Sequence, residues 1–238
     1  AQGLATTTAV DDSYHFESVG KFQVGACKAY SYKMTSQTWQ GAPWTHWLSI
    51  LVPPQVDHSD AAVLFITGGS TSSSQPQADS TEAQLFSVIA TMAKVPVAIL
   101  QQVPNQPLQG GLREDDLIAF TFDKYLNDQG DDWPLLLPMV ESARRAMDTV
   151  STIMAEKAGT AIKRFVISGA SKRGWTTWLT AAADKRVIAI APMVIDMLNM
   201  QPQMEQQIKS YGKFSGQIDP YSKLKIQARL TTARGKQL

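Results

Sequence analysis

Four short, uninterrupted apolar runs restrict the fold of this chain more than any other feature of its sequence. The runs are Ala61 to Ile66, Val97 to Leu100, Phe165 to Ile167 and Val187 to Val194. A strand that is apolar along its whole length is buried on both faces, which is typical of a parallel sheet covered by helices. Because helical patterns separate the runs, the sequence predicts an α/β fold with a mostly parallel central sheet.

Three segments are expected to form helices that cover this sheet. The first centres on the apolar positions Leu85, Val88, Ile89 and Met92, the second covers Glu114 to Leu126, and the third runs from Leu136 to Gly159. In the third segment apolar residues recur at three- and four-residue steps, so this helix is expected to pack on the sheet.

The remaining segments complete the predicted domain organisation. Imperfect alternation of polar and apolar residues from Tyr14 to Val52 predicts an antiparallel edge ahead of the parallel sheet. We therefore expect an α/β core over residues 13–199, preceded by a flexible lead-in over 1–12. Residues 200–238 are rich in Gln and Lys and interrupted by Gly and Pro, which predicts a helical cap or surface segment.

Composition excludes several classes of function. The chain has 22 basic and 21 acidic residues, so its net charge of +1 creates no field that would favour nucleic acid. No run approaches the roughly 20 apolar residues that a membrane-spanning helix needs. The acidic group 114–116 begins a predicted helix, where acids suit the helix dipole, and the acidic pair 131–132 lies in a loop, so neither predicts a metal site. The paired glycines 68–69 and 110–111 match no nucleotide-binding loop. We expect no metal and no cofactor, and the single Cys27 excludes an internal disulfide.

One segment predicts a specific chemistry. Residues 165–175 read as a buried strand, a sharp turn of small residues around Ser171, and the start of a helix. A nucleophile elbow needs this arrangement, because the strained turn lifts the serine oxygen clear of the sheet. Gly169 precedes the serine at the usual distance, but Gly174 follows it one position later than usual, where Arg173 takes the expected place.

An oxyanion hole is predicted around the same serine. In this fold one donor is the backbone N–H of the residue after the nucleophile, here Lys172, and the other comes from the loop after an earlier strand. Gly69 is the favoured second donor and Gly68 the next choice, because a bare backbone lets a carbonyl oxygen approach. The following helix is expected to carry one apolar stripe, formed by Trp175, Trp178, Leu179, Ala182 and Ala183, with Ser171 at its N-terminal end.

The motifs around Ser171 also resemble a known family. The resemblance to the PhoPQ-activated pathogenicity-related (PqaA-type) proteins rests on Ser168–Trp178 and 192–199, with support from 44–47, Pro53, 65–69, 217–219 and 234–236. It implies an exported α/β hydrolase, found in the periplasm or secreted by a Gram-negative bacterium, with a link to virulence and a poorly defined substrate. The resemblance also implies that the protein continues past Leu238.

The general base is missing from its expected place. A hydrolytic serine needs a base, normally a histidine that follows the nucleophile in this fold. The histidines of this chain are His15, His46 and His58, and all of them precede Ser171. The first explanation is a chain that is incomplete at its C-terminus, with the acid and histidine supplied by later sequence. The second explanation is a complete binding or signalling protein that has lost the base and does not catalyse a reaction. A third explanation, in which Lys172 acts as the base, is discounted because its side chain would point away from the serine.

Two residues near the elbow each have two possible roles. Asp196 follows the strand beside the elbow strand, where it would orient a histidine as the catalytic acid or cap a helix beginning at Met197. Arg173 would bind a substrate carboxylate or hold the loop through a salt bridge. His46, flanked by aromatic residues, is expected to be a packing residue. The resulting prediction is a serine hydrolase that cleaves an ester or amide of a small molecule or peptide.

Overall fold

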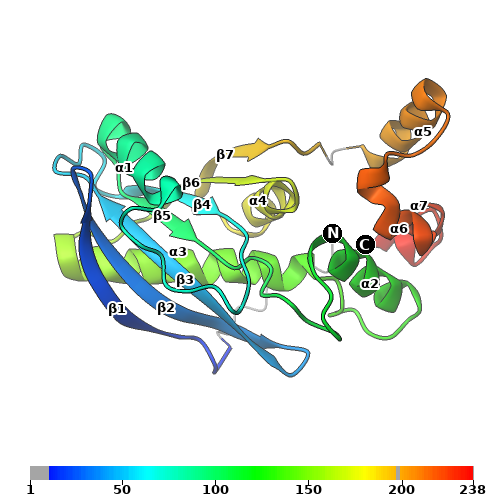
Figure 1. The fold of residues 1–238 in the computed structure, drawn as a ribbon, viewed down its shortest axis with the longest axis horizontal. Helices are drawn as coiled ribbons and strands as arrows, with labels where there is room; N and C mark the ends of the chain where they lie inside the picture. The colour runs from blue at the N-terminus through cyan, green and yellow to red at the C-terminus, as the bar shows by residue number, and fades with distance from the viewer. Residues whose placement is uncertain (1–10, 197–198, 238) are drawn as a thin grey trace.

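The computed structural model describes residues 11–196 and 199–237 and has a single mixed sheet of seven strands. The strands follow the order β1-β2-β3-β5-β4-β6-β7 across the sheet (Figure 1). β1, β2 and β3 are antiparallel, and β3 pairs with β5 in the same manner, whereas β5, β4, β6 and β7 are parallel. The strands are His15–Val24, Cys27–Trp39, Ala42–Val52, Ala61–Ile66, Val97–Leu100, Arg164–Ala170 and Val187–Met193.

Helices connect the parallel strands, as the alternation of apolar runs predicts. α1 (Thr81–Ala93) links β4 to β5, and α4 (Lys172–Ala183) links β6 to β7. The long α3 (Leu136–Ala158) precedes β6 and ends at Gly159, whose φ of 73° is the left-handed conformation that glycine adopts without strain. α2 (Glu114–Leu126) has the bounds that the sequence predicts. The prediction of a parallel core with an antiparallel N-terminal edge is confirmed.

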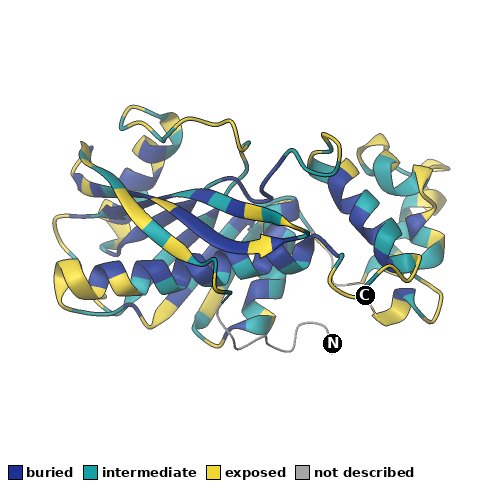
Figure 2. Ribbon diagram, turned by 90° about the horizontal axis from the view of Figure 1, so that it is seen from below, coloured by how far each residue is buried: buried dark blue, intermediate teal, exposed yellow. Residues whose placement is uncertain are grey.

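Two hydrophobic clusters fill the two faces of the sheet. On β4, Leu64 and Ile66 belong to the cluster under α3, whereas Val63 and Phe65 pack with the cluster under α1. Successive strand residues point to opposite faces, so a strand apolar at every position contributes to both clusters. Figure 2 shows the buried residues gathered along the sheet and α3. The continuous apolar runs therefore mark the strands with helices on both sides.

α1 packs on the sheet through Phe86 and small residues. Its buried residues are Ala83, Phe86, Ser87 and Ala90, whereas Leu85, Val88 and Met92 are exposed. The ring of Phe86 packs on Phe65 with 4.4 Å between centroids, and the small Ala83 and Ala90 let the helix approach the sheet there. Of the four apolar residues that locate this helix in the sequence, Ile89 packs against the core and the other three point outward.

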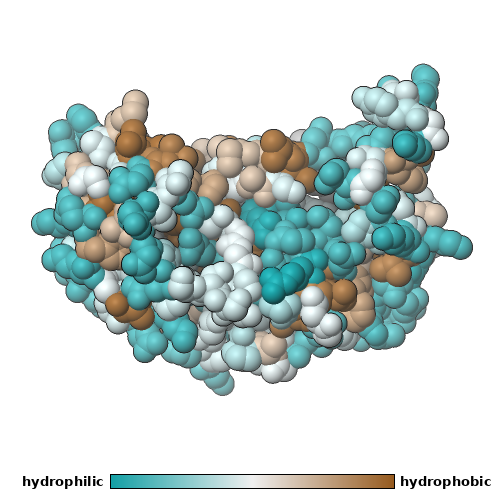
Figure 3. Space-filling view, viewed as in Figure 1, coloured by the Kyte–Doolittle hydropathy of each residue, from teal (hydrophilic) through white to brown (hydrophobic). Residues whose placement is uncertain are grey.

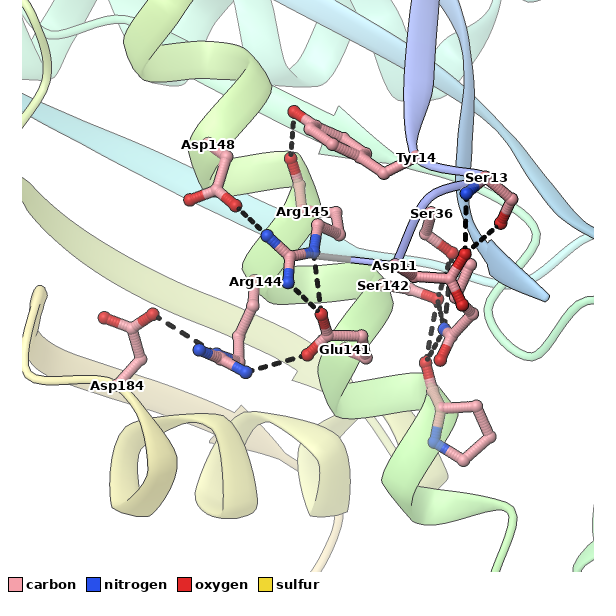
Figure 4. A network of polar contacts seen from close by, with 12 residues as sticks. Asp11, Ser13, Tyr14, Ser36, Glu141, Ser142, Arg144, Arg145, Asp148 and Asp184 are labelled. Carbon is pink, nitrogen blue, oxygen red and sulfur yellow. Dashed lines mark hydrogen bonds and ion pairs between the residues drawn. The ribbon is translucent and has the colours of Figure 1, made fainter. Parts of the chain in front are cut away.

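A charged seam on α3 joins the N-terminal edge and the end of α4 to the core (Figure 4). Arg145, only 4% exposed, contacts Glu141 at 2.6 Å and Asp148 at 2.8 Å. Its guanidinium also lies over the ring of Tyr14, just before β1, at 5.4 Å from the centroid. Arg144 extends the seam to Asp184 at the end of α4. Because each buried cation has carboxylate partners, the seam fixes these elements without leaving an isolated buried charge.

His46 lies in a second polar group, inside the core. It is fully buried on β3; its Nε2 is 3.0 Å from Ser36 Oγ and its Nδ1 is 3.1 Å from the carbonyl oxygen of Gln101. Burial lowers the pKa of His46 from 6.5 to about 4. The imidazole is therefore neutral at pH 7 and acts as a hydrogen-bonded packing residue of β3.

Acid is expected to destabilise the fold through His46. Between pH 6.5 and about 4 the unfolded chain binds a proton at this residue and the folded chain does not, so stability falls as pH decreases through this window. The wild type should lose about 3 kcal/mol more unfolding free energy than His46→Gln between pH 7 and pH 4. Urea unfolding of both proteins at a series of pH values measures the difference. Parallel pH profiles would show that His46 does not titrate as described.

A helical unit lies at one end of the sheet and includes the residues after β7 (Figure 1). It consists of α2, α5 (Met200–Tyr211), α6 (Asp219–Lys223), α7 (Ile226–Arg229) and the short turns 216–218 and 235–237. Tyr221 of α6 donates a hydrogen bond to Asp115 Oδ1 of α2 at 2.9 Å, and Arg234 lies 3.8 Å over the ring of Tyr125. These contacts fix residues 219–237 on α2. A role as a cap stays a prediction, and most of the proposed lead-in lies outside the described residues.

Candidate active site

Ser171 occupies an abrupt turn between β6 and α4. Its φ of 55° and ψ of −126° lie in a sparsely populated backbone region, where strain of about 1–3 kcal/mol is typical. Its N–H donates to the carbonyl oxygen of Met193, at the end of the neighbouring β7, at 2.9 Å. Its own carbonyl accepts from Trp175 N–H as the helix begins. The sharp reversal predicted at residue 171 is therefore present, directly after a strand in the parallel half of the sheet.

Two glycines make room for this reversal. A Cβ on Gly169 would lie 2.8 Å from the carbonyl oxygen of Arg173, so any side chain there would meet the first turn of α4. A Cβ on Gly174 would overlap the side chain of Ile195 and lie 3.2 Å from the carbonyl oxygen of Met193. The second glycine stands one position later than usual because residue 174, not 173, faces the chain leaving β7.

The helix after the serine matches the predicted apolar stripe only in part. α4 buries Thr176, Thr177 and Thr180, whereas Trp175 and Leu179 of the predicted stripe are partly buried against the core and Ala182 is exposed. Each threonine hydroxyl donates to the carbonyl oxygen four residues earlier. Short side chains with satisfied hydroxyls let the helix lie close to β6 and β7, and the large indole rings fit only at its flanks.

The predicted oxyanion donors meet at the carboxyl edge of the sheet. β4 pairs directly with β6, with Ile66 opposite Gly169, so Gly68 and Gly69 leave the sheet beside the elbow. A Cβ on Gly68 would lie 2.6 Å from an Nη of Arg173, and Gly69 has a φ of 137°. Within the described residues, the N–H groups of Gly68, Gly69 and Lys172 donate no hydrogen bond. A role of these amides in binding an oxyanion stays a prediction.

Glu114 connects both basic residues of the elbow to the first turn of α2. Arg173 forms two hydrogen bonds to its carboxylate at 2.9 and 2.6 Å, and Lys172 Nζ lies 2.7 Å from it. Burial raises the pKa of Glu114, but the hydrogen bonds from Arg173 and Lys172 outweigh this effect and lower the pKa to about 2. The salt bridge considered for Arg173 is present; substrate binding by Arg173 stays a prediction. Sequence reasoning assigned Glu114 only to the helix dipole.

Removing this carboxylate is expected to weaken the fold around the elbow. Glu114→Gln should lower the free energy of unfolding by about 2 kcal/mol at pH 7, less than for a fully buried ion pair because the side chain is 39% exposed. The lowered pKa means that this stability is present above pH 4.5 and decreases as pH falls toward 2. Urea unfolding measures the loss. Asp116→Asn, in the same helical turn, is the matched control, and an equal loss in both variants would contradict the prediction.

None of the three histidines can act as the base for Ser171 in this arrangement. His46 is buried on β3, three strands from β6 in the sheet order, or about 14 Å at the usual strand spacing. His15 begins β1 at the far edge of the sheet. His58 precedes β4, at the opposite end of the strands from the elbow. A histidine base for Ser171 would therefore have to come from outside residues 1–238.

Asp196 is exposed and lies three residues beyond the end of β7, on the same edge of the sheet as the elbow. The helix after it begins at Met200 with Asn199 at its N-cap, so Asp196 is not the cap of α5. Residue 197, where the alternative interpretation placed a helix start, lies outside the described residues. A role as catalytic acid stays a prediction, and its position after the strand beside β6 is compatible with that role.

A cavity of about 480 Å³ lies beside the loop that carries Gly68 and Gly69. Its lining includes Gly68, Gly69, Gln102 and Glu82, and most of its other residues are small or polar. Ser171 is not among the lining residues described. In residues 11–196 and 199–237, no three His, Cys, Asp or Glu side chains come together as a potential metal site. None of the helices described there combines the length and apolar character needed to cross a bilayer.

Comparison with known proteins gives one family and one curated relative. A model of the PhoPQ-activated pathogenicity-related protein family matches residues 5–238. The chain is 35% identical over 225 residues to the Autocrine proliferation repressor protein A of Dictyostelium discoideum. That match covers 90% of this chain but 45% of the relative, so the chain spans less than half the length of the relative.

Solved structures share the fold at low sequence identity. The acetyl xylan esterase from Paenibacillus sp. R4 superposes with a TM-score of 0.52 at 11% identity, over 94% of this chain and 65% of that one. The glucuronoyl esterase from Solibacter usitatus gives 0.51 at 13% identity, over 92% and 66%. These likenesses show an α/β-hydrolase fold. With the family match over almost its whole length, the chain belongs to the PhoPQ-activated pathogenicity-related protein family.

Proposed function

We propose that this chain carries the nucleophile and oxyanion hole of a serine hydrolase that cleaves an ester or amide through an acyl-enzyme. The backbone conformation of Ser171, at a strand-to-helix reversal beside a glycine loop, carries the proposal. Strained non-glycine residues persist where the surrounding structure enforces them, and they cluster at functional sites. A turn that served only to connect β6 to α4 would have no need of this strain.

The proposed chemistry follows the usual course of acyl transfer. Ser171 Oγ attacks the substrate carbonyl carbon while its proton passes to a base, and the N–H groups of Lys172 and Gly69, or Gly68, bind the oxyanion. The base then donates that proton to the leaving group, and water hydrolyses the acyl-enzyme in the second half of the reaction. Lys172 and Arg173 contribute through Glu114 by holding the first turn of α4 in place.

The histidine that acts as base is proposed to lie in sequence after residue 238. Two findings support this placement: the histidines of this chain lie away from Ser171, and the chain spans 45% of the length of its curated relative. Asp196 is the proposed acid that would orient it. Because the solved relatives are named as esterases, activated esters are the first substrates to test. Export to the periplasm or beyond the cell is proposed from the family alone.

A second candidate function is a secreted signalling or binding protein that does not hydrolyse a substrate. The observation in its favour is the relative from Dictyostelium discoideum, which is named as an autocrine repressor of proliferation. In that case the elbow would be an inherited element of the fold, because a fold by itself does not establish catalysis.

Covalent labelling separates the two candidates. The natural full-length protein is treated with a fluorophosphonate, and the modified peptide is located by mass spectrometry. The hydrolase predicts one adduct on Ser171 and its loss in Ser171→Ala. The 238-residue chain should label far more slowly if the base lies beyond it. Full-length protein that is folded but never labels would support the signalling candidate and overturn the hydrolase.

A further inference from the structure

A buried glutamine joins the glycine loop, residues 67–71, to the first turn of α2. Gln106, only 3% exposed, lies in the segment 101–113 between β5 and α2, which runs from the sheet to the helical unit (Figure 1). Its Nε2 donates to the carbonyl oxygen of Gly69 at 3.1 Å and to Glu114 Oε1 at 2.5 Å. Its Oε1 accepts from the N–H of Glu114 at 2.8 Å. Both hydrogens and the oxygen of this amide therefore have partners.

The glycine loop is held on both sides of its favoured oxyanion donor. The carbonyl oxygen of Gly68 accepts from the N–H of Gln102 at 2.8 Å. This carbonyl and the N–H of Gly69 belong to one planar peptide unit and point in opposite directions, so the bond fixes the direction of that N–H. Gln106 holds the next peptide unit through the Gly69 carbonyl, and its own carbonyl accepts from the N–H of Thr71 at 2.7 Å. Because glycine has wide conformational freedom, these bonds restrain a loop that would otherwise sample many conformations.

Glu114 connects the same glutamine to the other predicted donor. Its carboxylate accepts two hydrogen bonds from Arg173 and lies 2.7 Å from Lys172 Nζ. Arg173 Nε also donates to the carbonyl oxygen of Val103 at 2.5 Å, so the first turn of α4 is anchored to the segment 101–113 as well as to α2. Figure 3 shows hydrophilic residues gathered between the sheet and the helical unit on the face it draws. One buried amide thus spans from the glycine loop to the carboxylate that holds the start of α4.

Capping of α2 accounts for only part of this arrangement. The N-terminus of a helix needs acceptors for its free N–H groups, and Gln106 Oε1 supplies one to Glu114. The two hydrogens of the amide take no part in that cap, because they bind the Gly69 carbonyl and the Glu114 carboxylate. A buried polar group costs free energy unless it is hydrogen-bonded, so these donors have a second role that the cap does not explain.

We propose that Gln106 is a positioning residue for the oxyanion hole and holds the N–H of Gly69 in register with the N–H of Lys172, so that both point at one oxygen. The inference rests on the proposed function and assigns Gln106 no contact with the substrate. Oxyanion donors act at about 2.7–3.1 Å from the developing charge, and donors that are already oriented need no reorganisation when that charge forms. Without the amide, the glycine loop would have to be ordered during the reaction. The loss would therefore fall on the transition state more than on substrate binding.

Gln106→Met in the natural full-length protein tests this role. Methionine keeps the approximate length of the side chain and removes both donors and the acceptor. The kcat for a nitrophenyl acetate should fall about 10- to 100-fold while KM changes less than about twofold, because the donor is misplaced and the substrate site is not. Fluorophosphonate labelling of Ser171 should slow by a similar factor.

Gln37→Met is the matched control for the loss of a buried amide. Gln37 is 8% exposed, and its Nε2 donates to the carbonyl oxygen of Pro138 at 2.7 Å. It lies on β2, four strands from β6 in the sheet order. This variant should also lose stability, but its kcat, KM and labelling rate should stay at the wild-type values.

Hydrogen exchange of the same full-length proteins gives a second measurement that does not depend on activity. Peptides covering residues 67–71 should exchange faster in Gln106→Met than in the wild type or in Gln37→Met, because the glycine loop opens more often. If Gln106→Met does not fold, Gln106→Asn takes its place. It keeps an amide that is one methylene too short to join Glu114 to Gly69, and the same changes are expected.

The outcomes separate this inference from the proposed function. A folded Gln106 variant with the wild-type kcat, with a loss confined to KM, or with unchanged exchange of the glycine loop would overturn the positioning role and leave the hydrolase intact. A wild-type protein that neither hydrolyses the ester nor labels at Ser171 would overturn the proposed function, and the positioning role with it.

Discussion

Ser171→Ala is expected to lower kcat/KM for an activated ester by at least about 10⁴-fold in the natural full-length protein. Alanine removes the attacking oxygen and leaves the three free amides of the elbow and glycine loop in place. Only the oxyanion hole and substrate binding would then contribute to the rate. Spectrophotometric assays with a nitrophenyl acetate substrate measure the loss.

The interpretation of this loss depends on an intact fold. Alanine at position 171 keeps the same strained φ of 55°, so the unfolding midpoint should stay close to that of the wild type. Ser168→Ala is the matched control, because Ser168 lies on β6, three residues before the turn, and its hydroxyl donates to the carbonyl oxygen of Ala191 at 2.7 Å. That variant should retain activity. Full activity in Ser171→Ala would show that another residue is the nucleophile.

Gly169→Ala is expected to destabilise the protein by about 3 kcal/mol or more, although it adds a single methyl group. The new Cβ would lie 2.8 Å from the oxygen and 2.9 Å from the carbonyl carbon of Arg173. Both are backbone atoms in the first turn of α4 and cannot rotate away. Relief would require the helix to move from the sheet, which would also displace Ser171 and the Lys172 amide. Urea unfolding measures the stability, and fluorophosphonate labelling of the full-length protein measures the displacement.

Gly216→Ala provides the comparison for this substitution. Nothing lies within 4 Å of a Cβ at residue 216, in a short turn of the helical unit, and its backbone needs no positive φ. Its stability should remain within about 0.5 kcal/mol of the wild type. If Gly169→Ala and Gly216→Ala had similar stability, α4 would have moved to accept the new methyl group at residue 169. The close contact between β6 and α4 would then not be a requirement of the elbow.

Sequence periodicity determined the parallel half of the fold almost completely. The runs at 61–66 and 97–100 match β4 and β5 at both ends, and the helix at 114–126 matches α2. A strand apolar on both faces leaves little choice but a buried position between two layers of helices. Gly169 and Ser171 could be recognised for a similar reason, because a turn this tight tolerates few side chains on either side of its central residue.

Which apolar stripe of a helix faces inward was decided only in three dimensions. On α1 the larger Leu85, Val88 and Met92 point outward because the sheet below accepts Phe86 between two small alanines. On α4 the close approach to β6 selects threonines over indole rings. A periodic pattern shows that a helix has an apolar face; which of two candidate faces is buried depends on the shape of the surface it meets.

The surroundings of the serine likewise needed the tertiary structure. Arg173 and Glu114 are far apart in the chain, and no local pattern links an arginine in an elbow to the first acid of another helix. The sequence by itself determined where the parallel strands lie along the chain, the position of the sharp turn and the lack of a histidine between Ser171 and Leu238. Only the fold decided the partners of the charged groups, since long-range contacts depend on how distant segments pack.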